Sequence, residues 1–286
     1  MHPTRTVLTS FASFAPVALA LAGCGDNQTH PDPSVAYDAG LATPLQCVPN
    51  LDGTITESEL QSVLNVPVKY RVSPAGTLRT VNQDGTVDAT GQRVWDWGTS
   101  LADDQEIQIQ AVALSGKWYA ASFPGGTFVT PFDAADTLEA VYHEDDTTLW
   151  LHGLASTLES PPNGKTLYAY TQPVAVTKFP LTVGSSWTSV GTVVNGTLDG
   201  LPYASQDTYE ISDDALGELI LPDLTFTQAH RIRSKVTIDP AAGETLVTLE
   251  TSFYFECFGE VARATSQPNE TNPDFTTAAE VRRLGL

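Results

Sequence analysis

Short runs of β-branched and aromatic residues, separated by turn residues, make up most of the chain after residue 67. Such runs are typical of strands, and the gaps between them are too short for the helical crossovers of a parallel sheet. The predicted fold class is therefore all-β: a mainly antiparallel, curved sheet, arranged as a sandwich or half-barrel. We expect strands at residues 68–72, 106–114, 138–143, 148–154, 167–170, 186–194, 203–211, 217–221, 229–238 and 245–257.

Two segments show helical periodicity instead. In residues 56–64, Thr56 and Glu59 have the spacing of a capping box, and apolar residues follow at helical intervals. The second segment is residues 276–284, close to the carboxyl end. We predict a short N-terminal helix and a short C-terminal helix at these places.

The first residues carry one cation, Arg5, and are followed by an apolar run at 7–22 that is too short to span a bilayer. Together with small residues at its end, this pattern is typical of a secretory signal peptide, residues 1–23. The sequence Leu21-Ala22-Gly23-Cys24 resembles the lipobox of bacterial lipoproteins. The resemblance implies cleavage before Cys24 and attachment of fatty-acyl chains, such as palmitate, to that cysteine.

Residues 24–46 are polar, rich in Asp, Asn, Pro and Gly, and lack apolar periodicity. We expect them to form a disordered tether between the lipid and the folded region. Gly25 follows the cysteine and Asp26 comes one residue later, which favours the outer membrane under the usual sorting rule. The expected location is the bacterial cell envelope, at its periplasmic or cell-surface face, with the membrane as partner through the lipid.

The chain is strongly acidic. Its formal net charge is −20, and removal of residues 1–23 takes away one cation and no acid, so the mature charge is −21. Nucleic acids and anionic headgroups are bound by Lys and Arg, so we expect no nucleic-acid partner.

Three cysteines are present, and lipidation of Cys24 leaves Cys47 and Cys257. Two cysteines in an oxidising compartment usually pair. We therefore predict a Cys47–Cys257 disulfide, with two free thiols as the alternative.

The stretch at residues 156–164 is polar and contains two prolines. We place a boundary there: an N-terminal helix and β half at 47–155, a linker at 156–175, and a C-terminal β half at 176–286. The two halves can share one core, which the predicted disulfide favours because it joins the start of one half to the end of the other.

The segment from Asn50 resembles the second part of an EF-hand loop. Calcium would be bound by oxygens of Asn50, Asp52, Thr54 and Glu59. Val48 stands at the first ligand position and has no side-chain oxygen, and a tight turn that leads into a capped helix explains the same residues without metal. We expect no obligatory cofactor, with calcium as the alternative.

No motif of a known catalytic class is present: the chain has no HExxH, GxSxG, P-loop or GxGxxG. A turn at 144–147 would put His143 opposite Thr148 and His152 opposite Glu139, so we do not expect these histidines to be cross-strand partners. His230 is the third histidine beyond the tether.

Arg231, Arg233 and Lys235 alternate on one face of a predicted strand and could bind an anionic ligand. The alternative is cross-strand pairing, with Arg233 opposite Glu250. On the next strand the alternating apolar residues, including Phe253 and Phe255, are expected in the core, and an apolar ligand cavity is the alternative. Trp95 and Trp97 are also expected in the core, and a sugar-binding platform is the alternative.

The second half resembles a group of uncharacterised exported bacterial β proteins over residues 176–263. The matching pieces are Phe179-Pro180-Leu181 through Trp187, Gly217 through Pro222, Phe226 through Arg231, and Phe253-Tyr254-Phe255 with Gly259-Glu260-Val261. Cys257 and Phe258 depart from the small turn residues of that group. The resemblance implies a curved antiparallel sheet and an envelope location, and no catalytic residues.

These observations predict a membrane-anchored, non-catalytic envelope lipoprotein that acts as a binding or surface-structural component. Two alternatives stay open. The first is a carrier of an apolar ligand in the curved sheet, near Phe253 and Phe255. The second is an envelope hydrolase without a recognisable motif.

Overall fold

The computed structural model describes residues 47–286. The expected signal peptide, the tether and Cys24 lie outside these residues. Within them, no helix is long and apolar enough to cross a bilayer.

The described chain is dominated by antiparallel strands, as the alternating pattern predicts, and sixteen of them form one sheet. The elements are β1 (Thr54–Ile55), α1 (Glu57–Leu60), β2 (Val68–Val72), β3 (Arg79–Thr80), β4 (Thr86–Val87), β5 (Arg93–Asp96), β6 (Gln105–Ile109), β7 (Val112–Ala113), η1 (Ala120–Ser122), β8 (Phe128–Pro131), β9 (Leu138–Asp145), β10 (Thr148–Ser156), β11 (Leu167–Lys178), β12 (Leu181–Thr182), β13 (Ser186–Leu198), β14 (Leu201–Ile220), β15 (Thr225–Pro240), β16 (Leu246–Phe255), β17 (Gly259–Ser266) and β18 (Thr277–Leu284).

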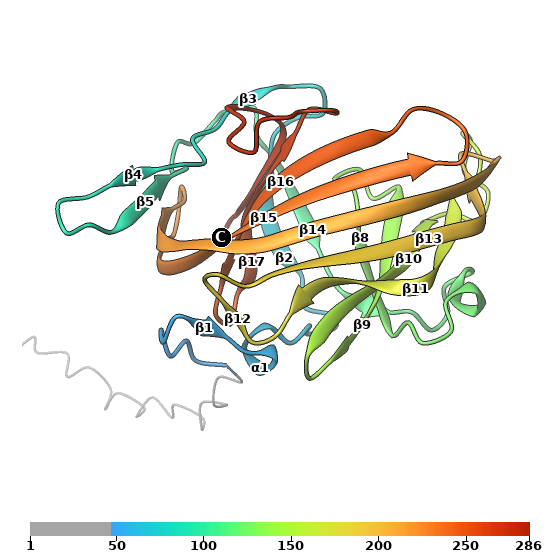
Figure 1. The fold of residues 1–286 in the computed structure, drawn as a ribbon, viewed down its shortest axis with the longest axis horizontal. Helices are drawn as coiled ribbons and strands as arrows, with labels where there is room; N and C mark the ends of the chain where they lie inside the picture. Colours follow the sequence, from blue (N-terminus) through green and yellow to red (C-terminus); the bar gives the residue numbers. More distant parts are fainter. Residues whose placement is uncertain (1–46) are drawn as a thin grey trace, which may run out of the picture. The chain divides into compact units, whose positions relative to one another are not determined.

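The strand order is β6-β2-β18-β17-β16-β15-β14-β13-β11-β10-β9-β8-β7, and the long strands β13 to β16 run side by side in Figure 1. The strands at the two ends of this order, β6 and β7, are separated in sequence only by Gln110 and Ala111. The sheet therefore rolls up until its two ends meet.

Contacts across the interior show the same curvature. Seven strand steps separate β9 from β17, which is about 34 Å along a flat sheet. The charge of Arg263 on β17 nevertheless acts on the hydroxyl of Tyr142 on β9. Both side chains therefore lie on the inside of the roll. We call this side of the sheet the inner face.

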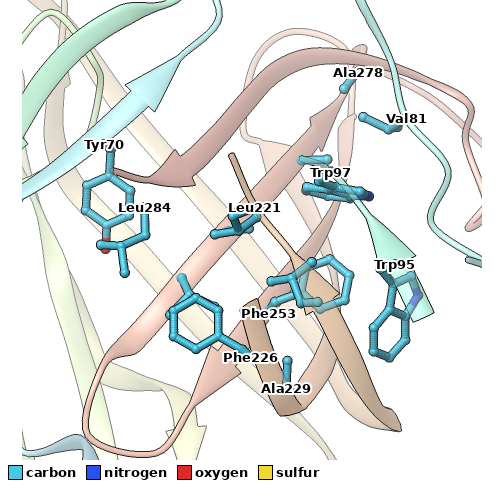
Figure 2. Close-up of a cluster of buried hydrophobic side chains, with 14 of the residues drawn as sticks. Tyr70, Val81, Trp95, Trp97, Leu221, Phe226, Ala229, Phe253, Ala278 and Leu284 are labelled. Atoms are coloured by element: carbon cyan, nitrogen blue, oxygen red, sulfur yellow. The ribbon is translucent and has the colours of Figure 1, made fainter. Parts of the chain in front are cut away.

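The largest apolar cluster covers the opposite, outer face of β14 to β18. Figure 2 shows Phe253 beside Trp95 and Trp97. Phe253 is fully buried, and its ring centroid lies 4.8 Å from that of Trp95 and 5.0 Å from that of Trp97. The indole nitrogen of Trp95 donates to the carbonyl of Gln83, and that of Trp97 to the carbonyl of Asn82. The expected core positions of both tryptophans and of Phe253 and Phe255 are thus confirmed.

The expected C-terminal helix is wrong, because residues 277–284 form β18. Ala, Glu, Arg and Leu favour helices, but propensity is a weak preference that pairing with neighbouring chain segments overrides. β18 pairs with β17 on one side and with β2 and β3 on the other. At the other end of the chain, α1 is a single turn with the Thr56–Glu59 capping box, and the rest of 56–64 is not helical.

The two expected β halves belong to the same sheet, because β11 (Leu167–Lys178) lies within it between β10 and β13. Half of the expected linker at 156–175 is therefore strand, and the connection between β10 and β11 is reduced to residues 157–166. The apolar alternation in 167–178 explains this arrangement: Tyr168, Tyr170 and Val174 are buried against β10 and β13.

Candidate functional site

The N-terminal segment closes one end of the inner face. Ile55 of β1 and Leu181 of β12 are fully buried against Ile211 of β14 and Ile232 of β15. The disulfide Cys47–Cys257, with Cα atoms 5.5 Å apart, fastens this segment to the turn after β16, as predicted. Because both the apolar contacts and the covalent bond hold it, this segment forms a fixed floor to the inner face.

Above this floor, tyrosines surround a buried carboxylate. Asp207 of β14 is 1% exposed, and its Oδ2 accepts a hydrogen bond of 2.8 Å from the hydroxyl of Tyr170. The Tyr209 hydroxyl lies 3.0 Å from that of Tyr170, while Tyr168 and Tyr203 pack beside them. Burial raises the pKa of Asp207 because it disfavours the charged form.

A charged group lies on the facing part of the inner face. Arg263 pairs with Glu260 at 3.7 Å and with Glu280 at 3.8 Å. Burial opposes the charge of this guanidinium, but these carboxylates and Glu250 raise the pKa of Arg263 overall. Tyr142 lies across the roll from Arg263, and burial is the main cause that raises its pKa to about 12.

A second buried acid, Asp213, bonds to His230, the third histidine beyond the expected tether. Its Oδ2 lies 2.7 Å from Nδ1 of His230, and both residues are 1% exposed. Burial raises the pKa of Asp213, and the hydrogen bond to His230 opposes the rise. The pair has the geometry by which a carboxylate orients an imidazole. Within residues 47–286, however, Nε2 of His230 has no hydrogen-bond partner, so no nucleophile completes a triad there.

Several buried polar atoms of the inner face lack a hydrogen-bond partner in the described part of the chain, including Asp207 Oδ1, Asp213 Oδ1, His230 Nε2, Ser205 Oγ and Arg263 Nε. Ser205 lies close enough to oppose the rise in the pKa of Asp207, but its hydroxyl does not reach hydrogen-bonding geometry. Buried polar atoms in folded proteins almost always have a partner, protein or otherwise. These atoms therefore mark places where a bound water or ligand group would be stabilised.

The predicted cation row lies on the outer face, and acidic residues pair with each member. Arg231 and Arg233 both donate to Asp214, and Arg233 also pairs with Asp274. Lys235 donates to Glu210 at 2.7 Å.

The expected partner of Arg233 is wrong, because the register places Thr251 opposite Arg233 and Glu250 opposite Ser234. The turn between β15 and β16 begins later than the sequence suggested, at Ala241. A slip of one residue moves a side chain to the other face of the sheet. Glu250 therefore belongs to the inner face.

The side-chain oxygens of the EF-hand-like loop accept hydrogen bonds from other groups of the same segment. Oε1 of Glu59 accepts from the Asn50 amide, and Oε2 accepts from the backbone and hydroxyl of Thr56. Oδ1 of Asp52 accepts from the backbone N–H of Thr54. Within residues 47–286 no group of three or more His, Cys, Asp or Glu is placed to hold a metal ion. Calcium at this loop stays a prediction, and binding would have to displace these hydrogen bonds.

Sequence reasoning missed the role of Glu256. This buried carboxylate accepts hydrogen bonds of 2.6 and 2.8 Å from the backbone N–H groups of Asn50 and Leu51. An acid immediately before the disulfide cysteine Cys257 is the one signal that could have suggested it. Glu256 thus adds a second fastening of the N-terminal segment beside the disulfide.

The expected register of the β9–β10 hairpin is wrong, because Trp150 and not Thr148 lies opposite His143. The two histidines are not a cross-strand pair, as expected, but their rings lie next to each other. Nδ1 of His143 lies 2.6 Å from Nε2 of His152. The hairpin turns at Asp146 and Thr147, which places Trp150 opposite His143, and a bulge between Leu151 and Gly153 turns His152 toward it. Burial, and to a lesser degree the charge of His143, lower the pKa of His152 to about 4.

Comparison with known proteins adds no family to this picture. No protein-family model, curated protein or solved structure matches the chain.

Proposed function

We propose that the chain is a non-catalytic envelope lipoprotein, anchored through lipid on Cys24, which binds a small polar ligand on the inner face of its sheet. The observation behind the binding role is the set of unpartnered buried atoms on Asp207, Asp213 and His230. A ligand with N–H and O–H groups would supply the donors that both carboxylates need, and an acceptor or donor for the imidazole.

The chemistry of the inner face favours a polar ligand over an apolar one. The two phenylalanines of the apolar-carrier alternative, Phe253 and Phe255, are packed in the outer core. The inner face instead presents hydroxyls, carboxylates and the guanidinium groups of Arg263 and its cross-strand partner Arg282. Burial is the main cause that raises the pKa values of Tyr209 and Tyr254. Both side chains nevertheless keep part of their surface accessible. Such side chains combine a flat apolar surface with a hydrogen-bonding hydroxyl, which suits hydroxylated or amine-bearing ligands.

A binding role is favoured over hydrolysis because the Asp213–His230 pair lacks a nucleophile among the described residues. Nucleophilic catalysis by an Asp–His pair needs a hydroxyl or thiol within hydrogen-bond reach of the second imidazole nitrogen. The same pair can instead present Nε2 of His230 to a bound molecule.

Mass spectrometry of the mature amino terminus tests the anchor. We expect Cys24 as the first residue, carrying a diacylglycerol thioether, and release of the Cys24→Ser variant from the membrane fraction. An unmodified terminus, or a first residue other than Cys24, would contradict the proposal.

Native mass spectrometry tests the ligand, with the full chain purified from cell envelopes in detergent. We expect a bound small molecule in the wild type, and its loss from a Tyr209→Phe/Tyr254→Phe variant, which removes two inner hydroxyls at nearly unchanged volume. Thr208→Val is the matched control, because it removes a hydroxyl from the opposite face of the same strand. The proposal fails if the wild type carries no additional mass and no member of a panel of polyols, amino acids and amines raises its melting temperature.

A further inference from the structure

Two imidazoles converge on the outer face of the β9–β10 hairpin, on the opposite side of the sheet from the inner face. His143 on β9 is half-buried, and His152 on β10 is 8% exposed. A bulge in β10 directs His152 toward its neighbour, so that the two nearest ring nitrogens lie 2.6 Å apart. Bulges commonly re-aim side chains at functional sites.

Neighbouring groups restrain both rings. The Trp150 indole stacks on His143 with an interplanar angle of 7° and ring centroids 6.0 Å apart. Trp150 is itself restrained, because its indole nitrogen donates to Asp145. On the other side, Gly125 approaches His152 so closely that an added Cβ would lie 3.4 Å from its Cε1. Restrained ligands lose little side-chain entropy when a metal ion binds.

The separation of the nitrogens is close to that of two ligands on one metal ion. Imidazole nitrogens lie about 2.0–2.1 Å from a bound transition metal, which puts two adjacent ligands about 3 Å apart at square-planar or tetrahedral angles. The observed 2.6 Å is shorter by only a few tenths of an ångström. A small rotation of His143, the more exposed ring, would admit the ion.

We propose that His143 and His152 form a binding site for a divalent first-row transition metal, with copper(II) as the preferred ion. Imidazole suits copper, nickel and zinc, and affinity for a given nitrogen site peaks at copper(II). No third His, Cys, Asp or Glu joins the pair within residues 47–286. Water or an external ligand would therefore complete the coordination, which makes this an open and exchangeable site.

Copper(II) titration of the chelator-treated full chain tests this site. All variants carry His2→Ala and His30→Ala, because these histidines of the expected signal and tether could bind copper themselves. We expect one copper(II) per chain by calorimetry, an electron paramagnetic resonance spectrum with two nitrogen ligands, and quenching of Trp150 fluorescence. Nickel(II) and zinc(II) should bind in the same place more weakly.

Three variants separate metal binding from structure. His143→Ala and His152→Ala should each weaken copper binding by about tenfold or more, since loss of even an outer-shell group costs that much. Trp150→Phe should keep the affinity and lose most of the quenching. His143→Gln, at the more exposed position, replaces His143→Ala if the latter fails to fold. The proposal is overturned if the folded histidine variants bind copper as tightly as their parent, or if the parent binds none.

Discussion

Replacement of Arg231 by alanine distinguishes a structural cation from a ligand-binding one. Its Nε and Nη2 donate to the two oxygens of Asp214 at 2.7 and 2.9 Å, and Nη1 donates to the Gln83 carbonyl at 2.6 Å. The guanidinium also lies 5.6 Å above the Trp95 ring. Arg231 is 5% exposed, so removal of this side chain opens a buried space and takes one of two donors from the Gln83 carbonyl, which keeps the Trp95 indole.

The expected cost follows from this burial. Breaking a buried ion pair destabilises by about 3–5 kcal/mol, and we expect the lower end, about 3 kcal/mol, because Asp214 keeps its bond to Arg233 and is partly exposed. Lys235→Ala is the matched control on the same strand face. Lys235 and Glu210 are both about half exposed, so loss of their pair should cost about 0–1 kcal/mol.

Urea unfolding of both variants, followed by tryptophan fluorescence, measures the two free energies. Addition of phosphate or sulfate should leave the unfolding midpoint of the wild type unchanged relative to chloride at equal ionic strength. If Arg231→Ala costs no more free energy of unfolding than Lys235→Ala, the ion pairs do not explain the cations at Arg231, Arg233 and Lys235. If phosphate or sulfate selectively stabilises the wild type, these cations bind anions instead.

Three further outcomes follow from burial, the disulfide and the inner acid. Phe253→Ala should lower the free energy of unfolding by about 3–5 kcal/mol in urea titrations, since its ring is fully buried. Phe132→Ala, at 48% exposure, should change this free energy little, and equal effects of the two variants would contradict the packing. Replacement of Cys47 and Cys257 by serine should cost about 4–5 kcal/mol in the same assay under oxidising conditions, and an unchanged midpoint would argue against the bridge. The raised pKa of Asp207 means that the folded state binds its proton more tightly than the unfolded state. Stability should therefore fall as the pH rises from the unfolded pKa through the raised folded value, and Asp207→Asn should flatten this dependence in unfolding curves measured across that range; an identical pH profile would refute the assignment.

Residue types and their spacing along the chain predict most strands, the disulfide and several core positions. Alternating apolar residues such as those on β16 predict a strand whatever surrounds them, because the side-chain period of a strand is two. The pairing of Cys47 with Cys257 followed from the cysteine count and from the oxidising compartment that the lipobox implies. Trp95, Trp97 and Phe253 were expected in the core, since large aromatic side chains bury most of the apolar surface.

Other features depended on contacts between distant segments. Residues 277–284 have good helix formers, but their hydrogen bonds go to β17 and β2, which no local pattern reveals. His143 and His152 meet because one bulge shifts the register, and Glu250 faces inward because a turn begins later than expected. A change of one residue in register reverses the face of every following side chain.

The sequence by itself therefore determined the all-β class, the disulfide and the expectation of a lipid anchor, because each depends on residue type, spacing or count. Only the tertiary structure decided which side chains share the inner face. Tyr142 and Arg263 come from strands far apart in the sequence, and they share the inner face because the sheet rolls until β6 and β7 adjoin. The curvature arises from the summed twist of many strands, a property of the whole sheet that no single segment specifies.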